Sequence, residues 1–446
     1  MESTGSVFPD FFAVFRIFWT IVIHGGWIAF IVLAIVILCT LYWFEIKKQF
    51  RDSIEWVFLS VRMPQENLVS SVAIEQIYAQ LHALHTTLTF THRYMEGRVQ
   101  MWYSLELVSL GGKISYIIRA PAKVRDLVEA AVYAQYPEAE ITEVADYLEN
   151  LHYDPDTSDF ELFGFEVKLE ENQVFPIKTY KDFEHPAAEQ KIIDPLASLL
   201  ESLGKMEPYE FYGVQIVIQP LADDEWIPLG EAKSKELLGE EVDEHLGFRG
   251  LLLKGVHTIM TLPFILLKAS AEAKVEYKKE NIRENKSNWL GLTDVEKERI
   301  NLIQRKISKP GYKTKIRHLY IAPKDKFDTN KKAMAIGAFR TLGSAQTNKM
   351  KPDVKKTWTD KDYIISPGLE EPYINWLIRR RKRHIFHGYK TRSILIGLPQ
   401  FIMNTEELAT LYHLPLSVVT TTPSIDQVAS KKAQPPVNLP VAEYQI

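Results

Sequence analysis

The basic residues at positions 378–392 form the densest charged stretch of the sequence, IRRRKRHIFHGYKTR. Guanidinium and ammonium groups bind phosphates or carboxylates, and the interspersed His, Phe and Tyr rings could stack on bases. Anionic lipid, an acidic protein and nucleic acid all remain open as ligands, beside a solvated face with no ligand. The expected contact residues are Arg379, Arg380, Arg381, Lys382, Arg383, Lys390 and Arg392.

Charge is segregated along the chain, although the net charge is only −4. Residues 301–392 contain 23 Lys or Arg against seven Asp or Glu, whereas residues 137–172 contain twelve Asp or Glu against one Lys. The small net charge gives no global attraction to nucleic acid, so any such binding must come from the basic region 301–392.

The sequence contains none of the common catalytic motifs. It has no phosphate-binding loop of the GxxxxGKS or GxxxxGKT type, no HExxH, no GxSxG and no GxGxxG. The pairs His82/His85 and His384/His387 lack a supporting third ligand, and Cys39 is the only cysteine. We therefore expect a protein that is not an enzyme, with no catalytic residues, no cofactor and no metal.

A run of 28 residues without Asp, Glu, Lys or Arg occupies positions 17–44. At about 1.5 Å per residue, a helix of this length exceeds the ~30 Å hydrocarbon core of a bilayer, which favours a transmembrane helix. Lys47, Lys48 and Arg51 follow the run, so the positive-inside rule predicts residues 1–16 outside and soluble domains in the cytoplasm. The expected location is the cytoplasmic (inner) membrane, with the lipid bilayer as a partner.

Two sets of elements with the same order follow this run. Residues 45–150 are predicted to form a strand, a helix, two strands joined at Gly111-Gly112, a helix and a strand, which is the ferredoxin-like βαββαβ order. Residues 151–400 repeat it if about 221–311 is an insertion with a helical hairpin, in which membrane contact by residues 250–268 is open. The predicted fold class is α+β: an N-terminal transmembrane helix, then two tandem ferredoxin-like units.

Residues 401–446 combine a short capped helix with a proline-rich tail. Asn404 caps the helix, and Glu407, three residues later, completes a capping box. Leu408 and Leu411 begin an apolar stripe, which we expect to meet a partner because only a linker-like segment follows. The predicted docking residues are Asn404, Glu407, Leu408 and Leu411.

Several segments together resemble the N-terminal, pre-motor region of bacterial type IV secretion or conjugation-type ATPases. They are EWVFLSVRMPQEN, YIIRAPAKVRDLVEAAVYAQYPEAEI, DPLASLLESL, QRKISKPGYKTKIRHLYIAPK, MNTEELATLYHLP and QPPVNLP, within residues 55–440. The chain is also similar to the membrane-anchored domain-of-unknown-function proteins related to that region. In the fused relatives a segment like NTEELATLYHLP leads into a P-loop motor, whereas this chain ends instead.

The resemblance implies a single-pass membrane scaffold or anchor subunit of a type IV secretion or conjugation-like transfer machine. Such a subunit would dock a separate P-loop ATPase, and it would form a homo-oligomer because the related motors are similar to hexameric translocases. The alternative is a membrane-anchored nucleic-acid-binding protein that uses the basic region 301–392. Steep weakening of binding by salt would favour this alternative.

Overall fold

The computed structural model describes residues 16, 19–20, 23, 27–64, 71–183, 194–239, 291–360, 367–415 and 427–428. The strands are β1 (Trp56–Pro64), β2 (Tyr103–Leu110), β3 (Lys113–Pro121), β4 (Glu140–Val144), β5 (Phe160–Leu169), β6 (Phe211–Leu221), β7 (Gly311–Pro323), β8 (Met350–Pro352), β9 (Phe401–Asn404) and β10 (Gln427–Val428). The helices are α2 (Trp27–Asp52), α3 (Ser71–His82), α4 (Phe90–Tyr94), α5 (Arg125–Gln135), α6 (Ala197–Gly204), α7 (Asp223–Leu238), α9 (Asp294–Ile307), α10 (Lys331–Arg340), α11 (Pro367–Lys390) and α12 (Thr405–Leu411).

The described strands form a single sheet. Their order is β10-β1-β3-β2-β6-β7-β5-β8, with β4 also paired to β1 and β9 also paired to β7. Neighbouring strands are antiparallel except β1 and β10. The hairpin turn predicted at Gly111 and Gly112 is confirmed, because both glycines have positive φ (58° and 83°) between β2 and β3.

This sheet contradicts the predicted pair of tandem ferredoxin-like units. Each half has the order strand-helix-strand-strand-helix-strand, but β2 pairs with β6 along the whole length of β2, from Tyr103↔Ile218 to Leu110↔Phe211. One hydrophobic core then extends across both halves, from Ile77 of α3 to Phe339 of α10. The prediction is wrong because β2 and β6, which would be edges of two separate units, satisfy each other's backbone hydrogen bonds.

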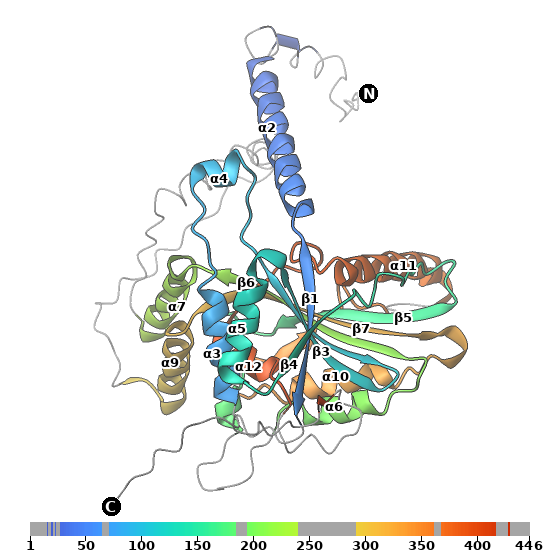
Figure 1. Cartoon of the computed structure of the whole chain (residues 1–446). Coiled ribbons are helices and arrows are strands. Elements are labelled where there is room, and N and C mark those ends of the chain that lie inside the picture. Colours follow the sequence, from blue (N-terminus) through green and yellow to red (C-terminus); the bar gives the residue numbers. More distant parts are fainter. Residues whose placement is uncertain are drawn as a thin grey trace, which may run out of the picture.

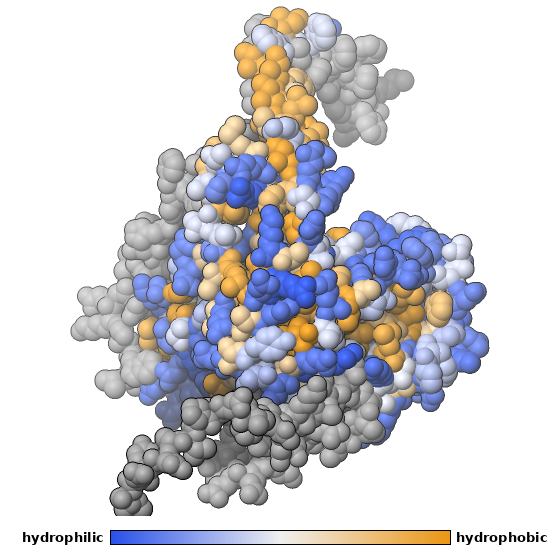
Figure 2. Space-filling model, in the orientation of Figure 1, coloured by the Kyte–Doolittle hydropathy of each residue, from blue (hydrophilic) through white to orange (hydrophobic). Residues whose placement is uncertain are grey.

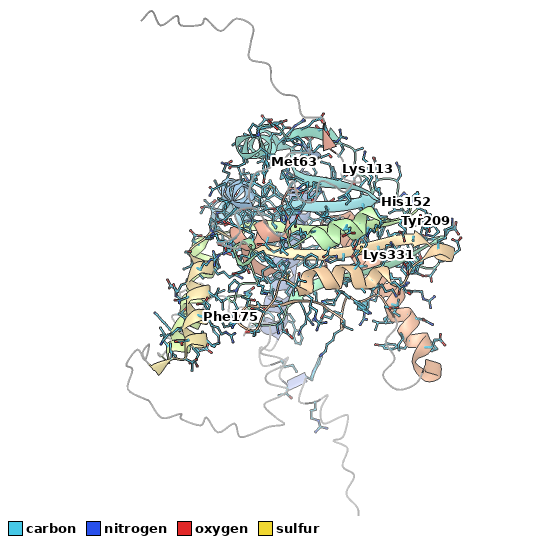
Figure 3. The ribbon with its side chains drawn as sticks, turned by 90° about the horizontal axis from the view of Figure 1, so that it is seen from below. Met63, Lys113, His152, Phe175, Tyr209 and Lys331 are labelled. Carbon is cyan, nitrogen blue, oxygen red and sulfur yellow. The ribbon has the colours of Figure 1, made fainter. Side chains whose placement is uncertain are left out.

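Helices cover both faces of the sheet. Helices α6 and α10 lie side by side on one face, where Figure 3, seen from below, marks the start of α10 with Lys331. Side chains of α3, α5 and α12 join the same core. Helix α11 lies on the other face (Figure 1), where Ile385 and Phe386 share a buried cluster with Leu319 of β7. The central strands are therefore buried on both sides.

Helix α2 extends away from the sheet (Figure 1), and its outer part shows mainly apolar side chains (Figure 2). The described helix begins at Trp27, so the 28-residue run of positions 17–44 is not one described helix. Its last turns carry charges and contact the sheet domain, since Trp43 Nε1 donates to the Arg93 carbonyl at 2.9 Å.

Among the described residues, no helix combines the length and the apolar character that crossing a membrane requires. The predicted transmembrane helix over residues 17–44 is therefore wrong for the part of the chain that the structure describes. The predicted single-pass topology, its orientation and the inner-membrane location depended on that span, and they are corrected with it.

Helices α7 and α9 pack against each other in the connection between β6 and β7. A capping box begins α9, since Thr293 and Glu296 exchange side-chain and backbone hydrogen bonds. A Cβ atom at Gly230 of α7 would stand 2.3 Å from Ile307 Cγ2, so the two helices approach closely. The open question of membrane contact by residues 250–268 lies outside the described residues.

Candidate functional site

Helix α11 divides the predicted contact residues between its two sides. On one side, Arg379 and Arg383 pair with Asp156, and Lys382 pairs with Glu161. These ion pairs join α11 to the acidic loop that precedes β5 and to the start of that strand. The three cations are therefore neutralised within the chain.

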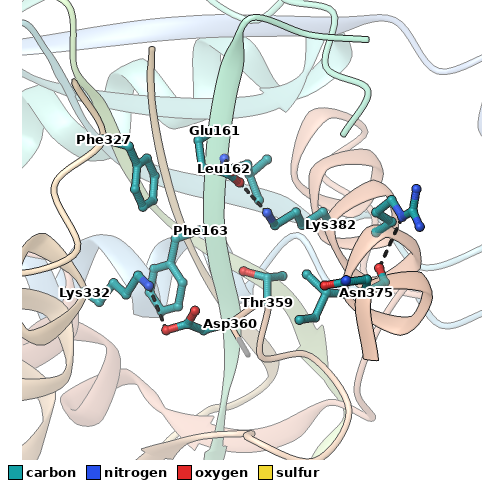
Figure 4. Close-up of a pocket in the computed structure, with 11 residues that line it drawn as sticks. Glu161, Leu162, Phe163, Phe327, Lys332, Thr359, Asp360, Asn375 and Lys382 are labelled. Atoms are coloured by element: carbon teal, nitrogen blue, oxygen red, sulfur yellow. Dashed lines mark hydrogen bonds and ion pairs between the residues drawn. The ribbon is translucent and has the colours of Figure 1, made fainter. Parts of the chain in front are cut away.

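A pocket of about 480 Å³ opens on this side of α11 (Figure 4). Its lysines are matched by acids, because Lys332 Nζ lies 2.7 Å from Asp360 Oδ2 and Lys382 pairs with Glu161. Phe163 forms part of the wall, with the Lys332 ammonium 5.3 Å from its ring centroid. Because its charges are balanced, this pocket has no preference for an anion.

A second hollow, of about 330 Å³, lies on the opposite side of α11. Leu377, Arg380, Arg381 and His384 line it at three- and four-residue intervals, which places them on one side of the helix. We call this hollow the α11 groove. Its cations are Lys355, Lys356, Arg380 and Arg381. None of these four pairs with a carboxylate in the described part of the chain.

The acid and the histidine in the α11 groove do not neutralise its cations. Glu166 is already bound by Arg317, whose Nε donates to Glu166 Oε1 at 2.8 Å. Arg381 donates to the Trp358 carbonyl at 3.0 Å, and its Nε is buried without a hydrogen-bond partner. Burial lowers the pKa of His384, so this imidazole is neutral at pH 7. The groove therefore keeps an excess of positive charge.

Two aromatic rings extend from α11 into solvent. Tyr373 is 64% exposed and Trp376 is 51% exposed, and their ring centroids lie 6.1 Å apart in a stacked arrangement. The Arg380 guanidinium lies 5.7 Å from the Trp376 ring centroid. Exposed aromatic side chains next to unpaired cations are typical of surfaces that bind another molecule.

The last two predicted contact residues turn into the protein. Lys390 Nζ donates to the Leu151 carbonyl at 2.8 Å. Arg392 adopts a left-handed backbone conformation (φ 51°), and its guanidinium bonds Asp146 at 2.5 and 2.7 Å and Glu106 at 3.1 Å. These contacts fix the end of α11 to the sheet, and Arg392 is only 1% exposed.

The predicted docking residues also lie inside the protein. The predicted capping box is confirmed, because Glu407 N donates to Asn404 Oδ1 at 2.9 Å and Asn404 N donates to Glu407 Oε2 at 3.0 Å. Leu408 and Leu411 belong to the main core, where α12 packs against α3. All four residues are buried, so they contact no partner in this conformation, and their docking role stays a prediction.

Ion pairs hold α12 in this buried position. Glu406 binds the cations of Lys181, Arg305 and Lys309, and Glu407 binds Lys306 at 3.0 Å. Burial of Glu406 favours its neutral form, but the bonds from Lys309 and the other cations outweigh burial and lower its pKa to about 2. The carboxylates of α12 are therefore used within the chain.

The histidine pairs form no metal site in the part of the chain that the structure describes. No group of three His, Cys, Asp or Glu side chains there could hold a metal ion. His82 Nε2 is hydrogen-bonded to the Leu221 carbonyl at 2.9 Å, and its ring lies 6.3 Å from that of His85. The expectation of a protein without enzyme activity or cofactor stays a prediction.

A family model described as "Domain of unknown function (DUF8128)" matches residues 45–427. The chain belongs to the DUF8128 family. A search of curated proteins finds no match. The DUF8128 region includes the α11 groove and α12, and it begins in the last turns of α2. The apolar part of α2, up to residue 44, precedes it.

The sequence indicates which side of α11 is neutralised, but it does not indicate the α11 groove. The acidic stretch 137–172 complements the basic stretch, and Asp156 and Glu161 come from it. Charge matching could therefore have predicted which face of α11 is neutralised. Lys355 and Lys356 precede α11 in a separate turn, and no local pattern places them beside Arg380.

Proposed function

We propose that this chain is a non-enzymatic scaffold subunit that binds an acidic segment of a separate protein in the α11 groove. The observation that carries the proposal is the group of four cations, Lys355, Lys356, Arg380 and Arg381, without a carboxylate partner among the described residues. Their neighbours on the other side of α11 are paired with acids. The contrast favours a groove that receives its negative charge from another molecule.

The surroundings of the groove suit a protein segment. A guanidinium can bind a carboxylate through two parallel N–H groups, and rim charges of this kind speed association and set specificity. The exposed rings of Tyr373 and Trp376 would supply apolar anchors beside the charges, since aromatic residues dominate the energetics of many interfaces.

A P-loop ATPase is the proposed partner. This step rests on the resemblance of the chain to the pre-motor region of type IV secretion or conjugation-type ATPases, and the α11 groove supplies a contact surface for it. In such a transfer machine the partner would hydrolyse ATP, and this chain would hold it in position.

Affinity purification of the full chain from cells of its native host tests this function. The variant Lys356→Glu/Arg380→Glu reverses two groove charges whose side chains make no described hydrogen bond or ion pair, so it should fold normally. The control Lys205→Glu/Lys324→Glu makes the same charge change at exposed sites away from the groove. We expect mass spectrometry to recover a P-loop ATPase with the wild type and the control, and about tenfold less with the groove variant. Equal recovery with all three proteins would contradict the proposal.

Single-stranded nucleic acid is a second candidate for the same groove, favoured by the exposed Trp376 and Tyr373 rings. Stacking of a base on such a ring contributes about 1–3 kcal/mol, so Trp376→Ala should weaken oligonucleotide binding about fivefold or more. Fluorescence anisotropy at several salt concentrations would measure it, and phosphate contacts require a steep loss of affinity as salt rises. Absence of binding at low salt would eliminate this candidate.

A further inference from the structure

A cleft separate from the α11 groove lies where α2 meets the sheet domain. Its volume is about 720 Å³, and its walls are the last turns of α2 and the segment around α4. The two walls are joined by the hydrogen bond from Trp43 Nε1 to the Arg93 carbonyl and by stacking of Trp43 on Tyr94, with ring centroids 5.2 Å apart. We call this hollow the α2–α4 cleft.

Close contacts fix the shape of this cleft. Gly97 has a φ of +64°, and a Cβ there would stand 2.3 Å from Ile46 Cγ2, so the segment after α4 lies directly against α2. At the floor, Gln219 donates to the Gln100 carbonyl at 2.7 Å, and Trp102 Nε1 donates to the Arg392 carbonyl at 3.0 Å. The floor therefore belongs to the well-packed sheet.

Three cations in the cleft lack acidic partners. Lys47 and Arg51 come from α2, and Arg93 comes from α4, and none of them pairs with a carboxylate in the described residues. The other cations of the cleft are matched, because Arg98 binds Glu96 at 2.6 Å and Lys313 binds Glu225 at 3.2 Å. The unpaired positive charge is thus confined to the wall formed by α2 and α4.

The three cations also repel one another. Partial burial lowers the pKa of Lys47, and the positive charges of Arg93 and Arg51 lower it further. Like charges held together in a half-buried cleft destabilise the empty state, and a bound anion would remove that cost. The aromatic wall adds a surface for an apolar or planar group, since the Lys47 ammonium already lies 3.3 Å from the Trp43 ring centroid.

We propose that the α2–α4 cleft binds a phosphate ester, with Lys47, Arg51 and Arg93 around the phosphate and Trp43 and Tyr94 against the remainder of the ligand. A phosphate monoester carries about −1.5 to −2 charges at pH 7 and three strong acceptor oxygens, which suits three neighbouring cations better than a single carboxylate does. The cleft also falls within the range of about 300–1,000 Å³ that is usual for small-ligand sites.

Binding measurements on the full chain test this site. The soluble probes are inorganic pyrophosphate and ATP, measured by calorimetry; the surface probes are phosphatidylcholine vesicles with and without phosphatidylglycerol, measured by sedimentation. The test variant is Arg51→Gln/Arg93→Gln, whose lost side chains make no described hydrogen bond or ion pair. The matched control is Arg98→Gln, which removes a cation of the same cleft that Glu96 already neutralises.

We expect the double variant to bind about tenfold or more weakly, because it loses two charge-assisted contacts, and the control to bind like the wild type. Loss confined to the soluble probes identifies a free phosphate ester, whereas loss confined to the phosphatidylglycerol vesicles identifies a lipid headgroup; both support the site. Equal binding by wild type and double variant, or no binding of any probe, overturns it. Lys47→Gln with an unchanged circular dichroism spectrum repeats the test if the double variant does not fold.

The groove variant Lys356→Glu/Arg380→Glu should bind the probes normally. Failure of the phosphate site and failure of the scaffold function are therefore distinguishable.

Discussion

Lys306 and Glu407 are both completely buried, and the Lys306 ammonium lies 3.0 Å from the Glu407 carboxylate. This pair joins α9 to α12 inside the protein. Glu407 also accepts a hydrogen bond from Ile177 N at 2.9 Å, so its carboxylate connects three segments of the chain. The contact shows that α12 is an integral part of the fold.

The Lys306–Glu407 pair leads to a prediction for a double-mutant cycle. Glu407→Gln leaves the Lys306 charge buried without a counter-charge, and breaking such a pair costs about 3–5 kcal/mol. Lys306→Met should cost a similar amount, because it leaves Glu407 uncompensated. We expect the double variant to lose clearly less than the sum of the two, as measured by urea unfolding. Strict additivity would contradict a direct interaction.

The pair of His413 and Asp194 predicts a dependence of stability on pH. His413 Nδ1 faces the Ala409 carbonyl at 3.1 Å and Nε2 faces Asp194 Oδ1 at 3.0 Å, so both ring nitrogens meet acceptors, as in an imidazolium. Burial opposes this charge, but the Asp194 carboxylate and the backbone acceptors outweigh it and raise the pKa of His413. The stabilisation is therefore complete below the unfolded pKa of about 6.5 and is lost as pH rises through the higher folded value.

Asp194 sets the lower pH limit of the stabilisation by this pair. Burial alone would raise its pKa, but His413 and two backbone N–H groups lower it, so its stabilisation is lost only as pH falls through that lowered value. We expect the free energy of unfolding to fall as pH rises from about 6.5 through the raised folded pKa of His413. His413→Gln should flatten this slope in the same urea titrations. A wild type with equal stability across that range would refute the assignment.

Gly397 and Gly337 provide a matched pair of substitutions. Gly397 has a φ of +94°, and a Cβ there would stand 2.0 Å from Glu166 Oε1, so Gly397→Ala should destabilise by about 2–4 kcal/mol through backbone strain and collision. Gly337 lies in α10 with no atom within 4 Å of its added Cβ. Gly337→Ala should stabilise by about 0.5–1 kcal/mol through helix propensity. Thermal unfolding of both variants measures the difference, and equal effects would be inconsistent with the geometry.

Replacement of arginine by lysine should affect stability differently at positions 392 and 379. Arg392→Lys keeps the charge but loses the two-pronged contact with Asp146 and the additional bond to Glu106, so we expect a loss of about 2 kcal/mol. Arg379→Lys changes an exposed ion pair with Asp156 and should leave the stability nearly unchanged. If both variants unfolded at the wild-type denaturant concentration, the structural role assigned to Arg392 would fail.

Local structure was the most predictable part of this protein. The capping boxes at Asn404 and Thr293 and the turn at Gly111-Gly112 depend on residues a few positions apart, so their patterns are visible in the sequence. The apolar stripe of Leu408 and Leu411 was also visible. Helical periodicity shows that a face is covered, but it does not show whether the same chain or a partner covers it.

Long-range pairing caused the errors in the predicted fold. Strands β2 and β6 have the mixed polar and apolar character that an edge strand also has, so two units and one continuous sheet are equally compatible with their sequences. The buried bond between Gln215 Nε2 and Glu106 Oε1, at 3.1 Å, adds to the backbone pairing of these strands, and the two positions are 109 residues apart. In the basic stretch 378–392, only the tertiary structure could separate paired cations from unpaired ones.

The late position of β9 and α12 in the chain affects folding during translation. The ribosome delivers these elements after all the strands of the central sheet, β1 to β8. Until residues 401–411 emerge, the first residues of β7 pair with β6 but lack β9 on their other edge, and the apolar side of α3 lacks α12. Folding intermediates with exposed apolar surface and unpaired strands aggregate readily. The nascent chain would therefore depend on chaperones until α12 closes the core.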